Sequence, residues 1–440
     1  MRLIAALRRR VSPAITGEAG EAQRNYWRAV ATLASGSFAS QLVGILSMLV
    51  LARIYAPDEF GSYTLFFTIA GLLSLVATAK YDGAVFLARR TSEAAQLAML
   101  AAAISGILGL VILAFAPFAN MMLADVTRYP IAFVVLLAAA TTSGGVMAAT
   151  VAWATQIQQF GAITAARLAQ ALIGAGVSIA LGFAHWDATG LILGFVAGQI
   201  AISAYLIVRL GFMPHVRAFR MRAARARAKR HANFPKFLLA SELLNYAGGN
   251  LFILVTPPLF GPATLGQYSL GFRLAALPLN LISFSMGSVF RSAISPQHLA
   301  PAQIPALFRA TFWRLCAAGL VFTLPLLVAG PLLFRIVFGA QWELAGFYVQ
   351  ILAPYMLVRF VGGPLTAMSV RAGRQRLDTL LQALFVVATT AAIGIGWWTA
   401  SFTVMLIAFS VLQSLVYILY LAIGYRLALE LAQPGKARTS

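Results

Sequence analysis

Long uninterrupted apolar runs are the feature that most limits what this chain can fold into. A helix needs about 20 apolar residues to cross the hydrocarbon core of a bilayer, and runs of this kind recur between residues 30 and 425. The chain is 60% hydrophobic and 10% charged, whereas a soluble domain carries roughly 25% charged residues. The runs lack the alternation of a transmembrane β-strand. The sequence therefore predicts an all-α polytopic membrane protein and excludes a soluble globule, a disordered chain and a membrane β-barrel.

The apolar runs divide into twelve predicted membrane spans. These are residues 30–52, 62–79, 96–116, 131–152, 164–184, 188–208, 237–259, 267–290, 307–334, 346–369, 379–399 and 402–425. The ninth contains Pro325 and Pro331, so we expect it to be kinked or tilted.

The basic residues indicate which span ends face the cytoplasm. With the N-terminus inside, the predicted inner segments hold most of the 33 Lys and Arg residues, and only Arg53, Arg128 and Arg335 lie outside. This asymmetry follows the positive-inside rule. It explains most of the net charge of +21 without nucleic acid as a partner. The sequence predicts a multi-pass membrane protein with both termini in the cytoplasm.

Two segments resemble each other at an offset of 205 residues. PDEFGSY (57–63) follows the first span and PATLGQY (262–268) follows the seventh. We interpret the proline as the end of a helix, the glycine as a tight turn and the tyrosine as a membrane-interface anchor. Because each repeat holds six spans, both enter the membrane in the same direction. The two bundles should then be related by a pseudo-two-fold axis along the membrane normal, with a cleft between them.

The predicted organisation has five parts. They are a cytoplasmic basic leader (1–28), an N-terminal six-helix bundle (29–210), a cytoplasmic basic linker (211–236), a C-terminal six-helix bundle (237–426) and a cytoplasmic tail (427–440). The basic linker has two interpretations that are compatible with each other: a solvated connection, or a contact with anionic lipid headgroups.

Charged residues within or beside the spans are the candidate functional residues. An ionised side chain at the bilayer centre costs about 2.5–3.5 kcal/mol on insertion scales and usually faces an interior cavity. The predicted substrate-binding residues are Arg53, Lys80, Arg273 and Arg359, and the predicted ion-coupling or ion-pair residues are Asp82 and Glu242. An excess of arginine predicts an anionic ligand, because a guanidinium matches phosphate oxygens well. No catalytic group, metal site or cofactor site is predicted, since the four histidines and the single cysteine show no ligand spacing.

Each candidate also has a structural interpretation. Arg273 could reach the outer surface, because it lies about two turns from the outer end of its span. Arg359, near the middle of the tenth span, could pair with a carboxylate, and Lys80 and Asp82 could mark the inner boundary of the membrane. Glu242, placed about two turns into the seventh span, could be an ion-pair partner or a proton-coupling group.

Several stretches resemble a known family. The stretches LARIYAPDEFGSY (51–63), KYD (80–82), FGPATLGQYSLGFRL (260–274), ILAPYMLVRFVGGPL (351–365) and GRQRLD (373–378) resemble bacterial polysaccharide flippases of the multidrug/oligosaccharidyl-lipid/polysaccharide exporter superfamily. The resemblance implies a V-shaped, MATE-like fold of twelve helices around a cationic cavity. It also implies that an undecaprenyl-pyrophosphate-linked oligosaccharide moves from the inner to the outer leaflet of a bacterial inner membrane. Arg53, Arg273 and Arg359 match arginine positions of that family, whereas Lys80 and Asp82 stand where relatives often carry Arg and Glu.

The implied partners are the lipid-linked oligosaccharide, membrane lipids, H⁺ or another coupling ion, and polysaccharide assembly machinery. A MATE-like drug or cation antiporter is the main alternative, although the first span lacks an acidic residue that could bind a cation. A membrane glycosyltransferase or polysaccharide polymerase is a further alternative. It would need a larger external domain than these short predicted outer loops supply.

Overall fold

The computed structural model describes residues 39–88, 90–123, 129–212, 221–230, 239–295 and 299–433, and all regular structure within them is helical. Ten of these helices are long and apolar enough to cross a membrane. The helix Ala39–Ile54 and α12 occupy the other two predicted positions. The predicted leader lies outside the described residues, as do parts of the predicted linker and tail.

The long helices follow the predicted order along the chain. They are the first helix (Ala39–Ile54), α3 (Pro57–Ala77), α5 (Thr91–Ala114), α7 (Pro130–Gln156), α8 (Phe160–Phe183), α9 (Asp187–Arg209), α12 (Leu239–Phe260), α13 (Pro262–Ala293), α14 (Ile304–Phe338), α15 (Glu343–Leu365), α17 (Gln375–Thr399) and α18 (Phe402–Ala432). Shorter helices are α4 (Tyr81–Val85), α6 (Ala119–Leu123), α11 (Met221–Arg230) and α16 (Ala367–Arg371).

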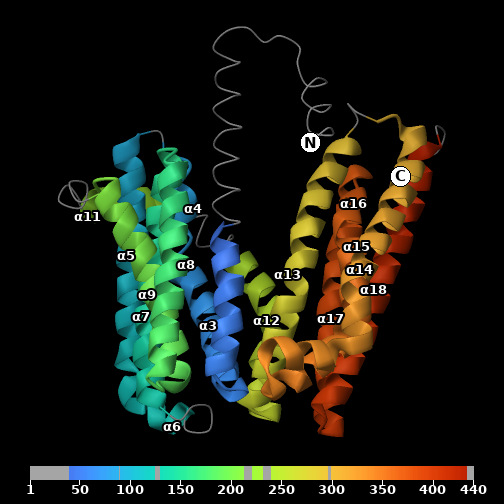
Figure 1. Ribbon diagram of the computed structural model, residues 1–440. Helices are drawn as coiled ribbons and strands as arrows, with labels where there is room; N and C mark the ends of the chain where they lie inside the picture. The colour runs from blue at the N-terminus through green and yellow to red at the C-terminus, as the bar shows by residue number, and fades with distance from the viewer. Residues whose placement is uncertain are drawn as a thin grey trace.

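The helices form two arms that meet at one end, so the molecule has a V shape (Figure 1). One arm contains α5, α7, α8 and α9, and the other contains α14, α15, α17 and α18. The first helix, α3 and α12 lie between the arms, while α13 runs from the middle along the second arm. We call the end where α3 and α13 begin the closed end, and the opposite end the open end.

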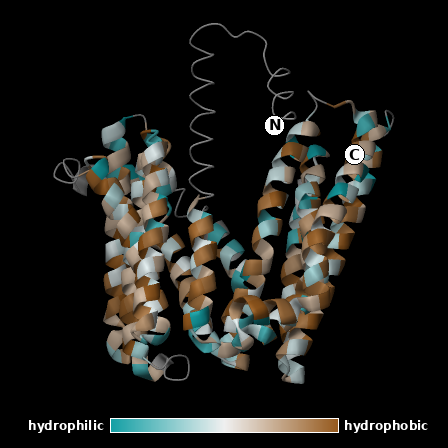
Figure 2. Cartoon of the chain, viewed as in Figure 1, coloured by the Kyte–Doolittle hydropathy of each residue, from teal (hydrophilic) through white to brown (hydrophobic). Residues whose placement is uncertain are grey.

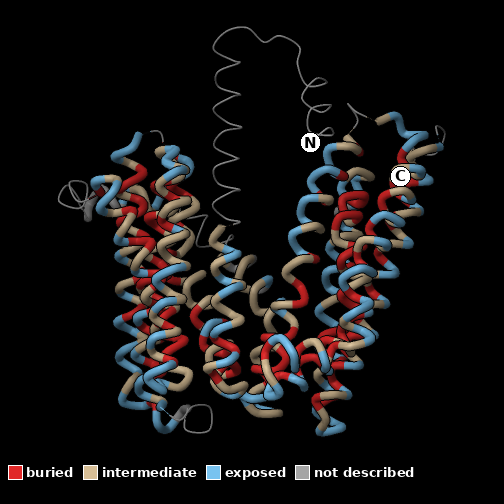
Figure 3. Tube along the Cα trace, in the orientation of Figure 1, coloured by how far each residue is buried: buried red, intermediate tan, exposed pale blue. Residues whose placement is uncertain are grey.

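The arms expose apolar side chains on their outer surfaces. Buried residues lie mainly between the helices of each arm, and exposed residues cover the outside (Figure 3). Hydrophobic residues extend along the outer helices (Figure 2). Among them Val328 is 72% exposed and Trp398 is 87% exposed. An apolar exterior of this extent is typical of a protein surrounded by lipid, and it confirms the predicted all-α membrane class.

The two repeated segments pack directly against each other at the closed end. A Cβ atom on Gly61 would lie 2.6 Å from the carbonyl carbon of Pro262, and one on Gly266 would lie 2.7 Å from the carbonyl carbon of Pro57. The hydroxyl oxygens of Thr64 and Ser269, which also differ by 205 in number, are 2.9 Å apart. Equivalent residues therefore meet across the contact, as expected where a pseudo-two-fold axis passes between α3 and α13.

This contact corrects the interpretation of the repeat. The prolines are the first residues of α3 and α13, and the glycines lie inside the helices instead of in turns. They allow two backbones to approach more closely than any side chain would permit. Tyr268 is 6% exposed and packs against Phe252 and Phe272, so it is a core residue and the prediction of an interface anchor was wrong.

The predicted irregularity of the ninth span is confirmed in α14. Ala329, between two prolines of this helix, has the non-helical angles φ −130° and ψ 21°. Next to it, the backbone of Gly330 packs against the backbone of Gly346 in α15. The bend is therefore the result of prolines that break the hydrogen-bond ladder beside a close backbone contact.

Candidate functional site

A cavity of about 1200 Å³ lies between the two halves of the chain. The first helix and α3 contribute one wall, and α12, α13, α15, α17 and α18 contribute the rest. We call it the central cavity. Both Arg273 and Arg359 line it, and among the described residues that line it none is an Asp or Glu. The charge that these residues present to the cavity is therefore positive.

Arg359 lies in α15 among aromatic side chains. Its guanidinium carbon is 5.7 Å from the ring centroid of Phe272, and it lies close to the hydroxyls of Tyr355 and Tyr417. None of the ion pairs seen in the described residues includes Arg359. The carboxylate partner considered from the sequence is therefore not found in this part of the chain. A cation surrounded by aromatic faces and neutral hydroxyls can still accept an anionic ligand.

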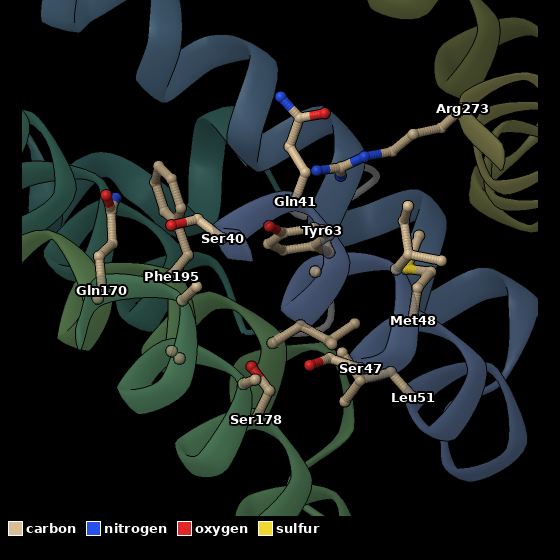
Figure 4. A pocket seen from close by; sticks show the side chains of 18 of the residues that line it. Ser40, Gln41, Ser47, Met48, Leu51, Tyr63, Gln170, Ser178, Phe195 and Arg273 are labelled. Carbon is tan, nitrogen blue, oxygen red and sulfur yellow. The ribbon is translucent and has the colours of Figure 1, made fainter. Parts of the chain in front are cut away.

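Arg273 lies in α13 at the junction of two cavities. It borders the central cavity and a second cavity of about 530 Å³, which lies between the first helix, α8 and α9. We call the latter the N-terminal side cavity. The Arg273 side chain extends toward Gln41 and Tyr63 (Figure 4). Its guanidinium thus faces the interior cavities and not the outer surface considered from the sequence.

Arg53 occupies a different place, in a clasp at the closed end. Its Nη2 atom donates to the backbone oxygens of Ile336 at 3.2 Å and Val337 at 2.9 Å. In return, Trp342 Nε1 donates to the backbone oxygen of Ala52 at 2.6 Å. Each helix end thereby receives donors from the other half of the chain, which satisfies carbonyl groups left open at a helix C-terminus. Arg53 is not among the residues that line the central cavity.

Lys80 and Asp82 lie where α3 turns into α4, and Glu242 of α12 lies next to them. Lys80 Nζ forms an ion pair with a carboxylate oxygen of Glu242, which lies in the first described turn of α12. Asp82 accepts a hydrogen bond from the hydroxyl of Thr78 at 2.6 Å. In this conformation Lys80 is neutralised by Glu242, which ties the end of α3 to the beginning of α12.

Arg291 is a cavity residue that the sequence interpretation did not select. A third cavity, of about 440 Å³, extends along α13 and α15 and is lined by both Arg291 and Arg359; we call it the C-terminal side cavity. Arg291 lies eighteen residues after Arg273, which equals five turns at 3.6 residues per turn, or roughly 27 Å. A search of α13 for polar residues at this period would have placed both arginines on one helix face.

The fold and the sequence can now be compared with known proteins. The family model for polysaccharide biosynthesis protein matches residues 50–345, about two thirds of the chain. The chain belongs to the polysaccharide biosynthesis protein family. The succinoglycan biosynthesis transport protein ExoT of Rhizobium meliloti (strain 1021) is 25% identical over 322 residues, which cover 69% of this chain. The chain spans only 60% of the length of that relative.

Solved structures show which fold this family member shares. An inward-facing multidrug resistance MATE family transporter of the MOP superfamily matches with a TM-score of 0.65 and 12% identity, over 90% of this chain and 96% of the other. The lipid II flippase MurJ, in an inward closed conformation, matches with a TM-score of 0.60 and 12% identity, over 91% of this chain and 89% of the other. A MOP superfamily transporter from Pyrococcus furiosus Vc1 (DSM3638) matches with a TM-score of 0.58 and 12% identity, over 92% of this chain and 96% of the other. The family member therefore has the MOP fold.

Proposed function

We propose that this polysaccharide biosynthesis protein is a flippase that moves a polyprenyl-diphosphate-linked oligosaccharide across a bacterial inner membrane. The polymer served would be a cell-surface or exported polysaccharide. The observation that carries the proposal is a large cavity between the two halves whose described lining contains Arg273 and Arg359 and no acidic residue. A diphosphate brings negative charge that compensates the two arginines of the cavity, while the polyprenyl tail stays in lipid.

The V shape supports movement by alternating access. Residues 29–210 and 237–426 would be the two bodies that rock against each other, with the basic segment 211–236 as their connection. By the positive-inside rule the open end, where α18 ends, would face the cytoplasm (Figure 1). In that orientation the structure is inward-facing, and the glycine contact and the Arg53 clasp close the outer side.

Transport in one direction needs a driving force. Exchange with H⁺ or another ion, or removal of the product outside, would supply it. Asp82 and Glu242 are the acidic residues that we predicted for ion coupling. In a coupled mechanism, the ion pair between Lys80 and Glu242 would break when Glu242 binds the coupling ion. Contact with polysaccharide assembly machinery stays a prediction of the same kind.

A drug or cation antiporter is the runner-up, because one structural neighbour is a multidrug transporter. The lining of the central cavity argues against it, since an acidic partner stabilises a bound cation and the described part of this lining has none.

The decisive experiment uses purified protein in lipid vesicles with a labelled polyprenyl-diphosphate glycan. Appearance of the label in the opposite leaflet should fall at least tenfold in Arg359→Ala and in Arg273→Ala, because each charge-assisted hydrogen bond contributes about 1.5–3 kcal/mol. Arg335→Ala is the matched control, since Arg335 is 61% exposed and pairs with Glu343 at 3.8 Å. Unchanged transport in both cavity variants would refute the proposal, and transport of drug cations would favour the antiporter.

A further inference from the structure

The N-terminal side cavity has a lining that differs from the rest of the site. Its volume of about 530 Å³ lies within the roughly 300–1,000 Å³ of small-molecule sites. Met48, Phe60, Tyr63 and Arg273 line both this cavity and the central cavity, so the two cavities are adjacent. A ligand whose phosphates lie at Arg273 would therefore have its neighbouring groups beside the N-terminal side cavity.

Uncharged polar groups are prominent along this cavity. Five side chains of the first helix and α8 supply hydroxyl or amide groups: Ser40, Gln41, Ser47, Gln170 and Ser178 (Figure 4). Amides and hydroxyls both donate and accept hydrogen bonds. The cations at its border are Arg167 and Arg273, and its lining as far as the structure describes it contains no acidic residue.

The two amides are available to a ligand. Gln170 Nε2 donates to the thioether sulfur of Met147 at 3.7 Å, which is a weak acceptor. Gln41 is exposed, and no hydrogen bond from its side chain to another described residue is seen. The amides of Gln41 and Gln170 could therefore form hydrogen bonds to the hydroxyl groups of a ligand without the loss of a strong hydrogen bond to another described residue.

Apolar faces complete the lining. The rings of Phe60, Tyr63 and Phe195 border the same space. Gly44, on the cavity face of the first helix, has no heavy atom within 4 Å of the position of an added Cβ. The absent side chain thus leaves open volume between the aromatic and the polar groups.

We infer that the N-terminal side cavity binds the sugar rings next to the diphosphate of the substrate, an inference that rests on the proposed function. A sugar ring carries several hydroxyl groups that donate and accept, and its C–H faces are apolar enough to pack on aromatic rings. A polyprenyl chain would leave the amides unsatisfied, and an organic cation would meet arginines. The cavity therefore selects among head groups, while Arg273 and Arg359 bind the diphosphate that all of them share.

The test is a binding experiment with purified protein and four probes. The probes are bare prenyl diphosphate and prenyl-diphosphate hexosides that carry glucose, galactose or N-acetylglucosamine. The measured quantity is the ratio of the Kd of the bare probe to the Kd of each hexoside. Two or more hydrogen bonds to the sugar should make this ratio about tenfold to a hundredfold for at least one hexoside.

Gly44→Leu adds an apolar side chain to the cavity, and its Cβ has no heavy atom within 4 Å, so it should reduce the ratio to about one and leave the Kd of the bare probe within about twofold. Gly176→Leu is the matched control, because Gly176 is an exposed helical glycine with equally free space and does not line the cavity. Gln170→Ala should lower the ratio by about threefold to tenfold.

Two results would overturn the inference: a ratio near one for all three hexosides in the unmodified protein, or equal weakening of bare probe and hexosides by Gly44→Leu. Failure of the proposed function has a different signature. In that case the bare probe does not bind, or Arg359→Ala leaves its Kd unchanged.

Discussion

The contact between Gly61 and Gly266 gives a quantitative expectation for the conformational equilibrium. An added methyl group on Gly61 would lie 2.6 Å from the Pro262 carbonyl carbon, and that carbon belongs to the backbone, which cannot rotate away. Overpacking of this kind costs about 1–3 kcal/mol. The cost applies only while α3 and α13 touch. Since 1.4 kcal/mol is a factor of ten, Gly61→Ala should reduce the population closed at this end by about fivefold to a hundredfold relative to the population open there.

A disulfide between the halves can measure this population. The hydroxyl oxygens of Thr64 and Ser269 are 2.9 Å apart, so Thr64→Cys with Ser269→Cys should cross-link in the closed state after modest adjustment. Cys316 is the single native cysteine and is replaced by Ser in the background. The initial rate of cross-linking in vesicles reports how often the two positions meet.

Gly61→Ala should lower that rate about tenfold. Gly394→Ala controls for the change in helix propensity, because nothing lies within 4 Å of its added Cβ. An unchanged rate in Gly61→Ala with an unchanged rate in the control would show that this contact does not limit closure, and the reasoning would fail.

Three further predictions concern other contacts. Arg53→Ala removes the hydrogen-bond donors at the end of α14 and should lower the same cross-linking rate by about threefold to tenfold. If the variant changed the affinity for diphosphate and left the cross-linking rate unchanged, the role of Arg53 in closing this end would be refuted. Lys80→Ala leaves Glu242 without its partner and should destabilise the protein by about 1–3 kcal/mol in thermal unfolding. The double variant with Glu242→Ala should recover part of that loss, and additive losses would show that the pair is not coupled. Gly346→Ala would force the backbone of α15 away from Gly330 and should lower the melting temperature by several degrees. A melting temperature equal to that of the unmodified protein would contradict this expectation.

The sequence predicted the large-scale architecture well because that architecture follows from local chemistry. Apolar run length and basic end residues are properties of single segments, so the twelve helix positions and the bend near Pro325 and Pro331 were accessible. The offset of the repeat was also visible, because equivalent residues such as Gly61 and Gly266 can be matched letter by letter.

What the repeated residues contact could not be read in the same way. A glycine in a turn and a glycine at a helix contact look alike until the distance between helices is known, and Tyr268 gave no sign that α13 buries it. Arg53 and Arg273 are both arginines near an outer span end, yet only Arg273 lines the central cavity. Their roles depend on which helix lies opposite, and that is a property of tertiary packing.

The backbone contact between the repeats constrains how such proteins can diverge. Each half contributes one glycine to a space that holds no side chain, so a change in either half is felt directly by the other. A chimaera that joins the first half of this chain to the second half of a relative should assemble only where the relative also leaves that space empty. Recombination between family members should therefore be limited by this one helix crossing.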